Sequence, residues 1–193
     1  MTFLHLRSRE TVVEPFKFFL APQALTVELS TVVLEWLESK APWQLVEASF
    51  YEQYEFSLMD VIIPSELRDA FSARNIADLR DLVAAAFEVS LDESFDATVH
   101  KLVPGQRIRI HNDYIPGRET HRVLIQLNRG WRNDNGGALM FFNSPDPADV
   151  ARVFWPVHNS CVAFEISPVS LHAVSTIHSG HRYTLVFSFY AKQ

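Results

Sequence analysis

At 193 residues with 48% hydrophobic content, the chain can bury a sizeable core as a single domain over residues 1–193, without disulfides or a structural metal. Its formal net charge of −6 at pH 7 provides no broad basic field, so nucleic acid is not expected as a partner. The lone cysteine, Cys161, excludes an intramolecular disulfide and any thiolate cluster, so a bound metal would be held by His and carboxylate groups.

The sequence shows no signal for export and none for membrane insertion. Charges begin at Arg7, so the N-terminus has no apolar run suited to a signal peptide, and no stretch approaches the roughly 18 apolar residues of a membrane span. We therefore expect a cytoplasmic protein with no membrane partner. Cys161 lies in an apolar run and is expected to be a packed core thiol rather than a nucleophile.

The first half of the chain, residues 1–91, is expected to supply helices and strands that support a sheet. Apolar residues recur at helical spacing in this half, and Pro22 suits a first helical turn. The predicted helices are residues 22–40, 64–71 and 76–89, and an aromatic-rich strand is predicted within residues 43–58.

Residues 92–193 change in character, because short β-rich runs alternate there with turn signals. The eight predicted strands are 95–103, 107–111, 122–128, 138–142, 150–157, 161–166, 171–177 and 182–190. Eight short strands with tight connections favour a mainly β, jelly-roll-like fold with the earlier helices on its outside.

His111 and Asp113 stand two residues apart at the end of a predicted strand, so both side chains can point to one side. His172, in a late predicted strand, is the best candidate for a third ligand. Two His and one carboxylate form the facial triad that leaves coordination sites of Fe(II) open for oxygen chemistry. An H-x-D triplet alone is common, and His178 is the main rival of His172.

Arg182 opens the last predicted strand, where polar residues share one face with Thr184 and apolar residues share the other. A guanidinium on the inner face of a barrel is costly unless a carboxylate meets it, and its planar fork suits such a partner. A diacid whose other end chelates the metal would meet this need, with Thr184 as a second donor. The alternative is an exposed arginine at a strand end.

Four motifs follow one another in the second half of the chain: His111-x-Asp113, Gly-Gly-Ala-Leu at 136–139, Ser-Leu-His-Ala-Val at 170–174 and Arg-Tyr-Thr-Leu-Val-Phe at 182–187. Over residues 95–190 the chain resembles the 2-oxoglutarate/Fe(II) dioxygenases, in their prolyl-4-hydroxylase-like branch. The resemblance implies a double-stranded β-helix (cupin-like) core, metal ligation and catalysis by His111, Asp113 and His172, and anchoring of 2-oxoglutarate by Arg182.

The resemblance also implies a reaction. An unactivated C–H bond would be hydroxylated with Fe(II), O₂ and 2-oxoglutarate, which is decarboxylated to succinate, and ascorbate can support turnover. The family often places a tyrosine before the Leu-Asn pair and another before the Pro-Gly turn, but Gln126 and Val103 stand there. Gln126 could still donate its amide to the co-substrate.

Three residues near the site are candidates for contact with the primary substrate: Arg109, Arg122 and Trp131. Each has a plain alternative, because the arginines can be solvated or structural and Trp131 can cap the barrel. The polar loop 129–135 could lie over the opening.

Three functions remain open at this point. The first is hydroxylation of a peptidyl or protein side chain, with proline favoured by analogy. The second is oxidation of a free amino acid or natural-product intermediate. The third is a non-catalytic β-barrel binding module whose His and Asp residues are incidental.

Overall fold

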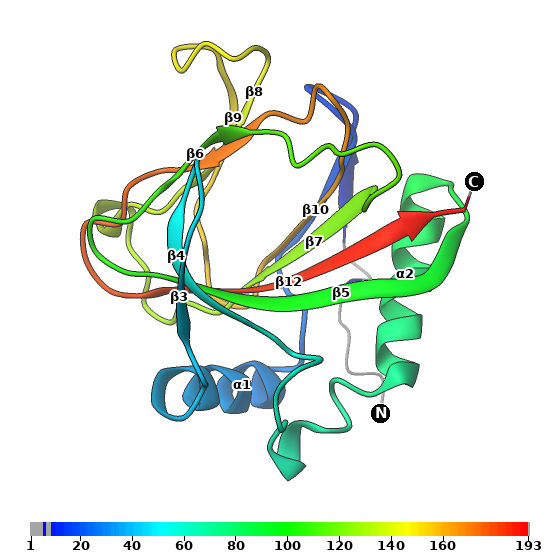
Figure 1. Ribbon diagram of the computed structural model, residues 1–193, viewed down its shortest axis with the longest axis vertical. Coiled ribbons are helices and arrows are strands. Elements are labelled where there is room, and N and C mark those ends of the chain that lie inside the picture. Colours follow the sequence, from blue (N-terminus) through cyan, green and yellow to red (C-terminus); the bar gives the residue numbers. More distant parts are fainter. Residues whose placement is uncertain (1–5, 7–8, 193) are drawn as a thin grey trace.

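Two antiparallel sheets face each other, and the chain passes back and forth between them (Figure 1). The computed structural model describes residue 6 and residues 9–192. The large sheet has the order β1-β2-β10-β7-β12-β5-β4-β3, and the small sheet has the order β6-β11-β8-β9. The strands are β1 (Glu10–Val12), β2 (Phe18–Ala21), β3 (Gln44–Glu47), β4 (Glu52–Ser57), β5 (Leu91–Leu102), β6 (Ile108–His111), β7 (His121–Gln126), β8 (Leu139–Phe142), β9 (Val150–Phe154), β10 (Cys161–Glu165), β11 (His172–Val174) and β12 (Arg182–Ala191).

The eight strands predicted in the second half correspond to β5 to β12, and the predicted mainly β fold is confirmed. Four of them, β5, β7, β10 and β12, lie in the large sheet, and the other four form the small sheet. This alternation is the double-stranded β-helix arrangement.

The first half of the chain extends the large sheet and covers its outer face. Strands β1 and β2 add to one edge, and the β3–β4 hairpin adds to the other. Helices α1 (Val27–Ser39) and α2 (Ala73–Phe87) lie outside this sheet (Figure 1). Their starts are fixed by Thr26 and Ser72, whose side chains accept hydrogen bonds from backbone N–H groups of the first turn.

Two hydrophobic cores lie on opposite sides of the large sheet. One packs α1 and α2 against its outer face, where Leu79, Val83 and Phe187 are buried. The other lies between the sheets and includes Phe141 and Phe164. Period-two alternation along the strands explains this division, since each strand of the large sheet sends alternate residues to each core.

The predicted helix 64–71 is wrong. Only a single 3-10 turn, Ser65–Leu67, forms there, followed by hydrogen-bonded turns that lead into α2. The Asn75 side chain donates to the carbonyl of Asp69 at 2.6 Å, which joins this turn to the start of α2 without a continuous helix between them. A second 3-10 turn, Asn133–Asn135, precedes β8. In the described part of the chain, no helix is long and apolar enough to cross a membrane.

Candidate active site

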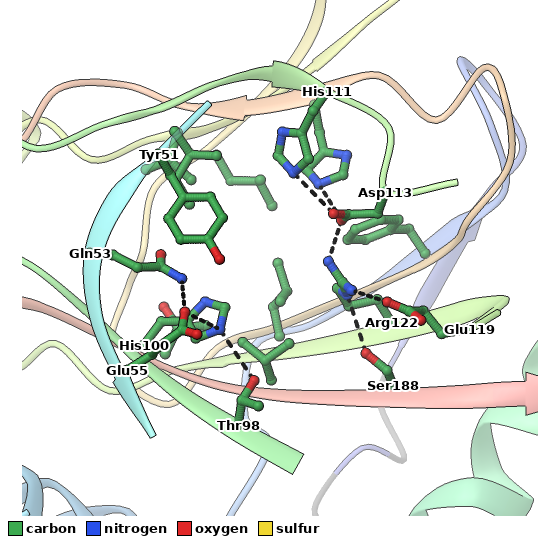
Figure 2. A pocket seen from close by; sticks show the side chains of 18 of the residues that line it. Tyr51, Gln53, Glu55, Thr98, His100, His111, Asp113, Glu119, Arg122 and Ser188 are labelled. Atoms are coloured by element: carbon green, nitrogen blue, oxygen red, sulfur yellow. Dashed lines mark hydrogen bonds and ion pairs between the residues drawn. The ribbon is translucent and has the colours of Figure 1, made fainter. Parts of the chain in front are cut away.

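A cavity of about 360 Å³ opens between the two sheets (Figure 2). Its apolar base belongs to the inter-sheet core and includes Leu124, Phe164 and Val186. Its polar groups come from two sides: the metal-ligand candidates on the small sheet, and side chains of β4, β5, β7 and β12 on the large sheet. A cavity with an apolar base and a few convergent polar groups is the usual form of a small-molecule site.

The structure brings His111, Asp113 and His172 together at the rim of the small sheet. Their candidate ligand atoms all lie within 4.8 Å of one another, and in the described residues no other group of three or more such side chains does so. His111 and His172 face each other in the register of β6 and β11. Asp113 lies beyond β6, in a left-handed conformation with φ 57° that turns its carboxylate back toward both imidazoles.

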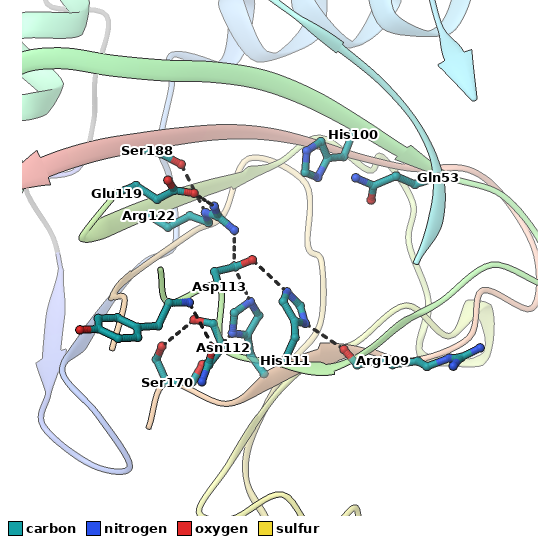
Figure 3. Close-up of polar contacts among 12 residues, drawn as sticks. Gln53, His100, Arg109, His111, Asn112, Asp113, Glu119, Arg122, Ser170 and Ser188 are labelled. Carbon is teal, nitrogen blue, oxygen red and sulfur yellow. Dashed lines mark hydrogen bonds and ion pairs between the residues drawn. The ribbon is translucent and has the colours of Figure 1, made fainter. Parts of the chain in front are cut away.

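Each imidazole is oriented by a backbone carbonyl. His111 Nδ1 lies 2.8 Å from the carbonyl oxygen of Arg109, and His172 Nδ1 lies 2.8 Å from that of Ser170 (Figure 3). A carbonyl only accepts, so each Nδ1 carries the proton and, in the neutral ring, each Nε2 has a free lone pair. Burial lowers the pKa of His172, which keeps its ring neutral. This is how metal-binding histidines are held.

The two Nε2 atoms face the carboxylate of Asp113, at 3.3 Å for His111 and 3.1 Å for His172. Burial acts to raise the pKa of Asp113, but the Arg122 guanidinium and the two imidazoles outweigh it and hold this pKa well below its usual range. Three acceptors therefore converge without a protein proton between them. A divalent cation satisfies all three, so the residues fit an Fe(II) ion.

Arg122 holds Asp113 from behind. Its guanidinium forms ion pairs with Asp113 and, at 2.9 Å, with Glu119, while its Nε lies 3.3 Å from Ser188 Oγ (Figure 2). Although Arg122 lines the cavity, its charge is used within the protein. Of its two predicted alternatives, the structural one fits this geometry.

Arg182 lies inside the barrel, as the alternation of its strand predicts, with 3% of its surface exposed. It donates from Nη1 to Thr184 Oγ1 at 2.8 Å, and its buried Nε has no hydrogen-bond partner. No carboxylate in the described residues lies within ion-pair distance of it. Burial lowers the pKa of Arg182 to about 10, so it stays charged at neutral pH. Its guanidinium therefore suits an anionic ligand.

Thr184 and Gln126 form a short chain behind Arg182. Thr184 Oγ1 donates to Gln126 Oε1 at 3.0 Å, across the register of β12 and β7. Thr184 lines the cavity, whereas Gln126 is 2% exposed and does not. Gln126 thus supports Thr184 and lies one side chain away from the space in which a co-substrate would bind.

The stem of Arg182 passes close to the backbone of Gly137, which has φ 71°. A Cβ atom at Gly137 would lie 2.6 Å from Ile177 Cδ1 and 3.1 Å from Arg182 Cδ. Only glycine fits this position without moving one of those side chains. Gly137 of the Gly-Gly-Ala-Leu motif therefore serves the placement of Arg182.

Two of the predicted substrate contacts lie elsewhere. Arg109 is exposed and faces away from the cavity, because β6 has an extra residue opposite β11 and this bulge puts Ile108 on the face of His111 instead. Trp131 packs beside Gly137, donates to the Gly136 carbonyl at 3.0 Å and does not line the cavity.

The rival histidine, His178, is exposed beside Gly136 and lies outside the group of three.

Sequence reasoning missed the large-sheet wall of the cavity. Tyr51, Gln53 and Glu55 project from β4 and its start, and His100 and Thr98 project from β5 (Figure 2). The signal for this wall was weak, because the face of β4 that lines the cavity is polar and the apolar residues Tyr54 and Phe56 lie on its other face.

One known family matches the part of the chain that supplies the cavity side chains described above, except those of β4 and its start. The family model of the 2OG-Fe(II) oxygenase superfamily matches residues 97–190, which include His111, Asp113, His172 and Arg182. The matched stretch is just under half of the chain, and over it the chain is similar to this superfamily. The similarity indicates a 2-oxoglutarate-dependent oxygenase with Fe(II) as cofactor and O₂ as second co-substrate.

Among curated proteins, this oxygenase is similar to prolyl 3-hydroxylase OGFOD1 of Xenopus laevis. The two are 28% identical over 103 residues, which are 52% of this chain and 20% of that protein. The matched stretch is thus about a fifth of the relative's length.

Two solved structures share the fold. A prolyl-4-hydroxylase of Pseudomonas putida superposes with a TM-score of 0.72 at 19% identity, covering 91% of this chain and 93% of that one. A prolyl hydroxylase of Trichoplax adhaerens, solved with a hypoxia inducible factor peptide fragment, has a TM-score of 0.69 at 16% identity, with 90% and 83% covered. The oxygenase therefore has the architecture of prolyl hydroxylases.

Proposed function

We propose that this oxygenase hydroxylates an unactivated C–H bond of a peptidyl or protein side chain, with decarboxylation of 2-oxoglutarate to succinate. His111, Asp113 and His172 would hold Fe(II). Arg182, oriented by its hydrogen bond to Thr184 Oγ1, would hold the distal carboxylate of 2-oxoglutarate, and Thr184 could join it only if its hydroxyl turned away from Gln126. The observation that carries the proposal is the pairing of three converging acceptors with an unpaired buried guanidinium in one cavity.

The division of labour follows from the geometry. When bound, Fe(II) supplies the activation of O₂ that the family couples to 2-oxoglutarate decarboxylation. The protein orients both imidazoles through the carbonyls of Arg109 and Ser170. It also keeps Asp113 ionised through Arg122 and presents a charged fork to the diacid. The apolar base of the cavity excludes water from the reacting carbon.

Proline is the first side chain to test, because the relative and the structural neighbours are named as prolyl hydroxylases. The experiment measures succinate release by the full chain with Fe(II), 2-oxoglutarate and ascorbate, in the presence of proline-containing peptides or free amino acids. We expect succinate and a peptide that gains one oxygen atom. Absence of both, together with absence of iron binding, would favour a non-catalytic binding module.

A further inference from the structure

Strand β4 presents a row of polar side chains that neither the ligand trio nor Arg182 uses. Tyr51, Gln53 and Glu55 are spaced two apart, so they share the face that lines the cavity (Figure 2). Tyr51 is fixed in place by a backbone bridge to Ile108 of β6. The row faces the candidate metal ligands from the opposite wall, where a bound substrate would contact it.

Gln53 has an unused acceptor in this row. Its residue is 2% exposed, and its Nε2 donates to Glu55 Oε2 at 2.6 Å, but its buried Oε1 has no hydrogen-bond partner. Buried polar atoms in folded proteins nearly always have a partner. A hydrogen-bond donor supplied by a ligand would satisfy this oxygen.

Glu55 has no cationic partner in the described residues. Its nearest basic group is His100 Nε2 at 3.9 Å, and Thr98 Oγ1 lies 3.2 Å from the same nitrogen. Burial, together with the charges of Arg122 and Arg182, lowers the pKa of His100 to about 3, so this imidazole is neutral. The Glu55 carboxylate, with 24% of its side chain exposed, is therefore uncompensated.

The other charges of the loaded site cancel. Fe(II) offsets the two charges of 2-oxoglutarate, and the three carboxylates of Asp96, Asp113 and Glu119 offset the three guanidinium groups of Arg118, Arg122 and Arg182. Glu55 then keeps one negative charge in a partly desolvated cavity. Such a charge favours a cation over a neutral ligand.

Tyr51 lies between Glu55 and the ligand trio, with its hydroxyl directed into the open space (Figure 2). Burial raises the pKa of Tyr51, and the carboxylates of Glu55 and Asp113 add to the effect, so the phenol keeps its proton. It can donate one hydrogen bond and accept another from a substrate that spans the cavity.

We propose that Gln53 and Glu55 bind a positively charged nitrogen of the substrate, an ammonium or a guanidinium group, and so select for substrates with a basic group near the oxidised carbon. The inference rests on the oxygenase function proposed above. Such a nitrogen offers one N–H to the carboxylate of Glu55 and another to Gln53 Oε1. The group can come from a lysine or arginine in a peptide or from the free amino acid.

The test compares cationic compounds with neutral partners of similar shape. The probes are capped arginine against capped citrulline, capped lysine against capped Nε-acetyl-lysine, and the free amino acids in a second arm. Calorimetry on the full chain without O₂ gives the ratio of affinities for the cationic and the neutral probe of each pair. Succinate release with Fe(II) and 2-oxoglutarate gives the ratio of their turnover rates. We expect a preference of about tenfold or more for the cation in the wild type.

Two variants and one control make the result specific. Glu55→Gln should reduce the cation preference about tenfold, and Gln53→Met should reduce it less, because only one acceptor is lost. Glu47→Gln makes the same charge change on exposed β3, outside the cavity, and should keep the wild-type ratio. If Glu55→Gln does not fold, Gln53→Met decides.

The outcomes separate this inference from the proposed function. Equal binding of cationic and neutral probes by the wild type overturns the inference, even if succinate is formed. A clear cation preference without any succinate supports the cation site of Gln53 and Glu55 and counts against the proposed function. A preference that survives both Glu55→Gln and Gln53→Met places the cation elsewhere and also overturns the inference.

Discussion

Of the three arginines that line the cavity, Arg122 and Arg182 have opposite surroundings. Arg122 meets the carboxylates of Asp113 and Glu119 and the hydroxyl of Ser188. Arg182 is more deeply buried, yet it meets only the hydroxyl of Thr184 and keeps an unpartnered Nε. The difference teaches that burial of a charge does not define its role. Arg122 supports an ionised Asp113, whereas the arrangement around Arg182 is incomplete without an anion.

The largest expected effect concerns Asp113, the carboxylate that Arg122 holds. If Asp113 did not bind metal, the role given to Arg122 would be lost. In Asp113→Asn the charge is lost while the left-handed backbone, which Asn tolerates, is kept. We expect Fe(II) affinity and succinate release to fall by at least about 100-fold, with His111→Ala giving a similar loss. Metal content and circular dichroism check this, and wild-type turnover in either folded variant would end the assignment of the trio.

Removing the second guanidinium tests the other half of the contrast. In Arg182→Met we expect the KM for 2-oxoglutarate to rise roughly 10- to 100-fold, since about 1.5–3 kcal/mol of charge-assisted hydrogen bonding is lost. The Tm without ligand should not fall, because a buried charge without a carboxylate partner is removed. Thermal unfolding with and without 2-oxoglutarate measures both effects. An unchanged KM would show that the diacid binds elsewhere.

The same substitution at Arg122 should have the opposite profile. Arg122→Met leaves Asp113 and Glu119 facing each other without a cation, so we expect a loss of about 2 kcal/mol of stability, partly limited by solvent access. That corresponds to roughly 4–8 °C in Tm for a chain of this size. A Tm equal to that of Arg182→Met would remove the distinction between the two arginines.

The smallest effect concerns His100, whose pKa is lowered to about 3 by burial and then by Arg122 and Arg182. Between pH 6.5 and about 3 the unfolded chain binds a proton at this residue and the folded chain does not, so stability is lost as the pH falls through this range. His100→Gln should flatten this loss. Urea midpoints at several pH values measure it, and parallel curves for both proteins would contradict the expectation.

The fold could be predicted from the sequence because its strands are short and their boundaries are marked. Turn residues such as Gly105 and Gly180 separate the β-rich runs, so all eight strands of the second half were found. The prediction for 64–71 failed because its apolar spacing resembles a helix, while the folded chain forms only a 3-10 turn and further turns there.

The candidate site was predictable only where one strand carries the signal. Arg182 points inward because β12 alternates regularly. Alternation along one strand predicted Asp113 beside His111. The structure brings the two together in another way, because Asp113 lies beyond β6 in a left-handed conformation. Period-two spacing predicted Arg109 on the face of His111, but the bulge in β6 turns Arg109 to the other face. The row that includes Gln53 was missed because it is polar, while the opposite face of β4 carries Tyr54 and the buried Phe56 and so gives the only apolar signal.

Gly137 has a consequence for how this protein can evolve. Because Gly137 has no side chain, the stem of Arg182 can pass close to its backbone and reach into the barrel. This contact involves the apolar stem of Arg182 and no polar atom. A mutation to alanine at this one codon would displace Ile177 or Arg182, and with it the position of the charged fork. Adaptation to a different concentration of the diacid can therefore act through a backbone position, while the residues proposed to bind the diacid stay the same.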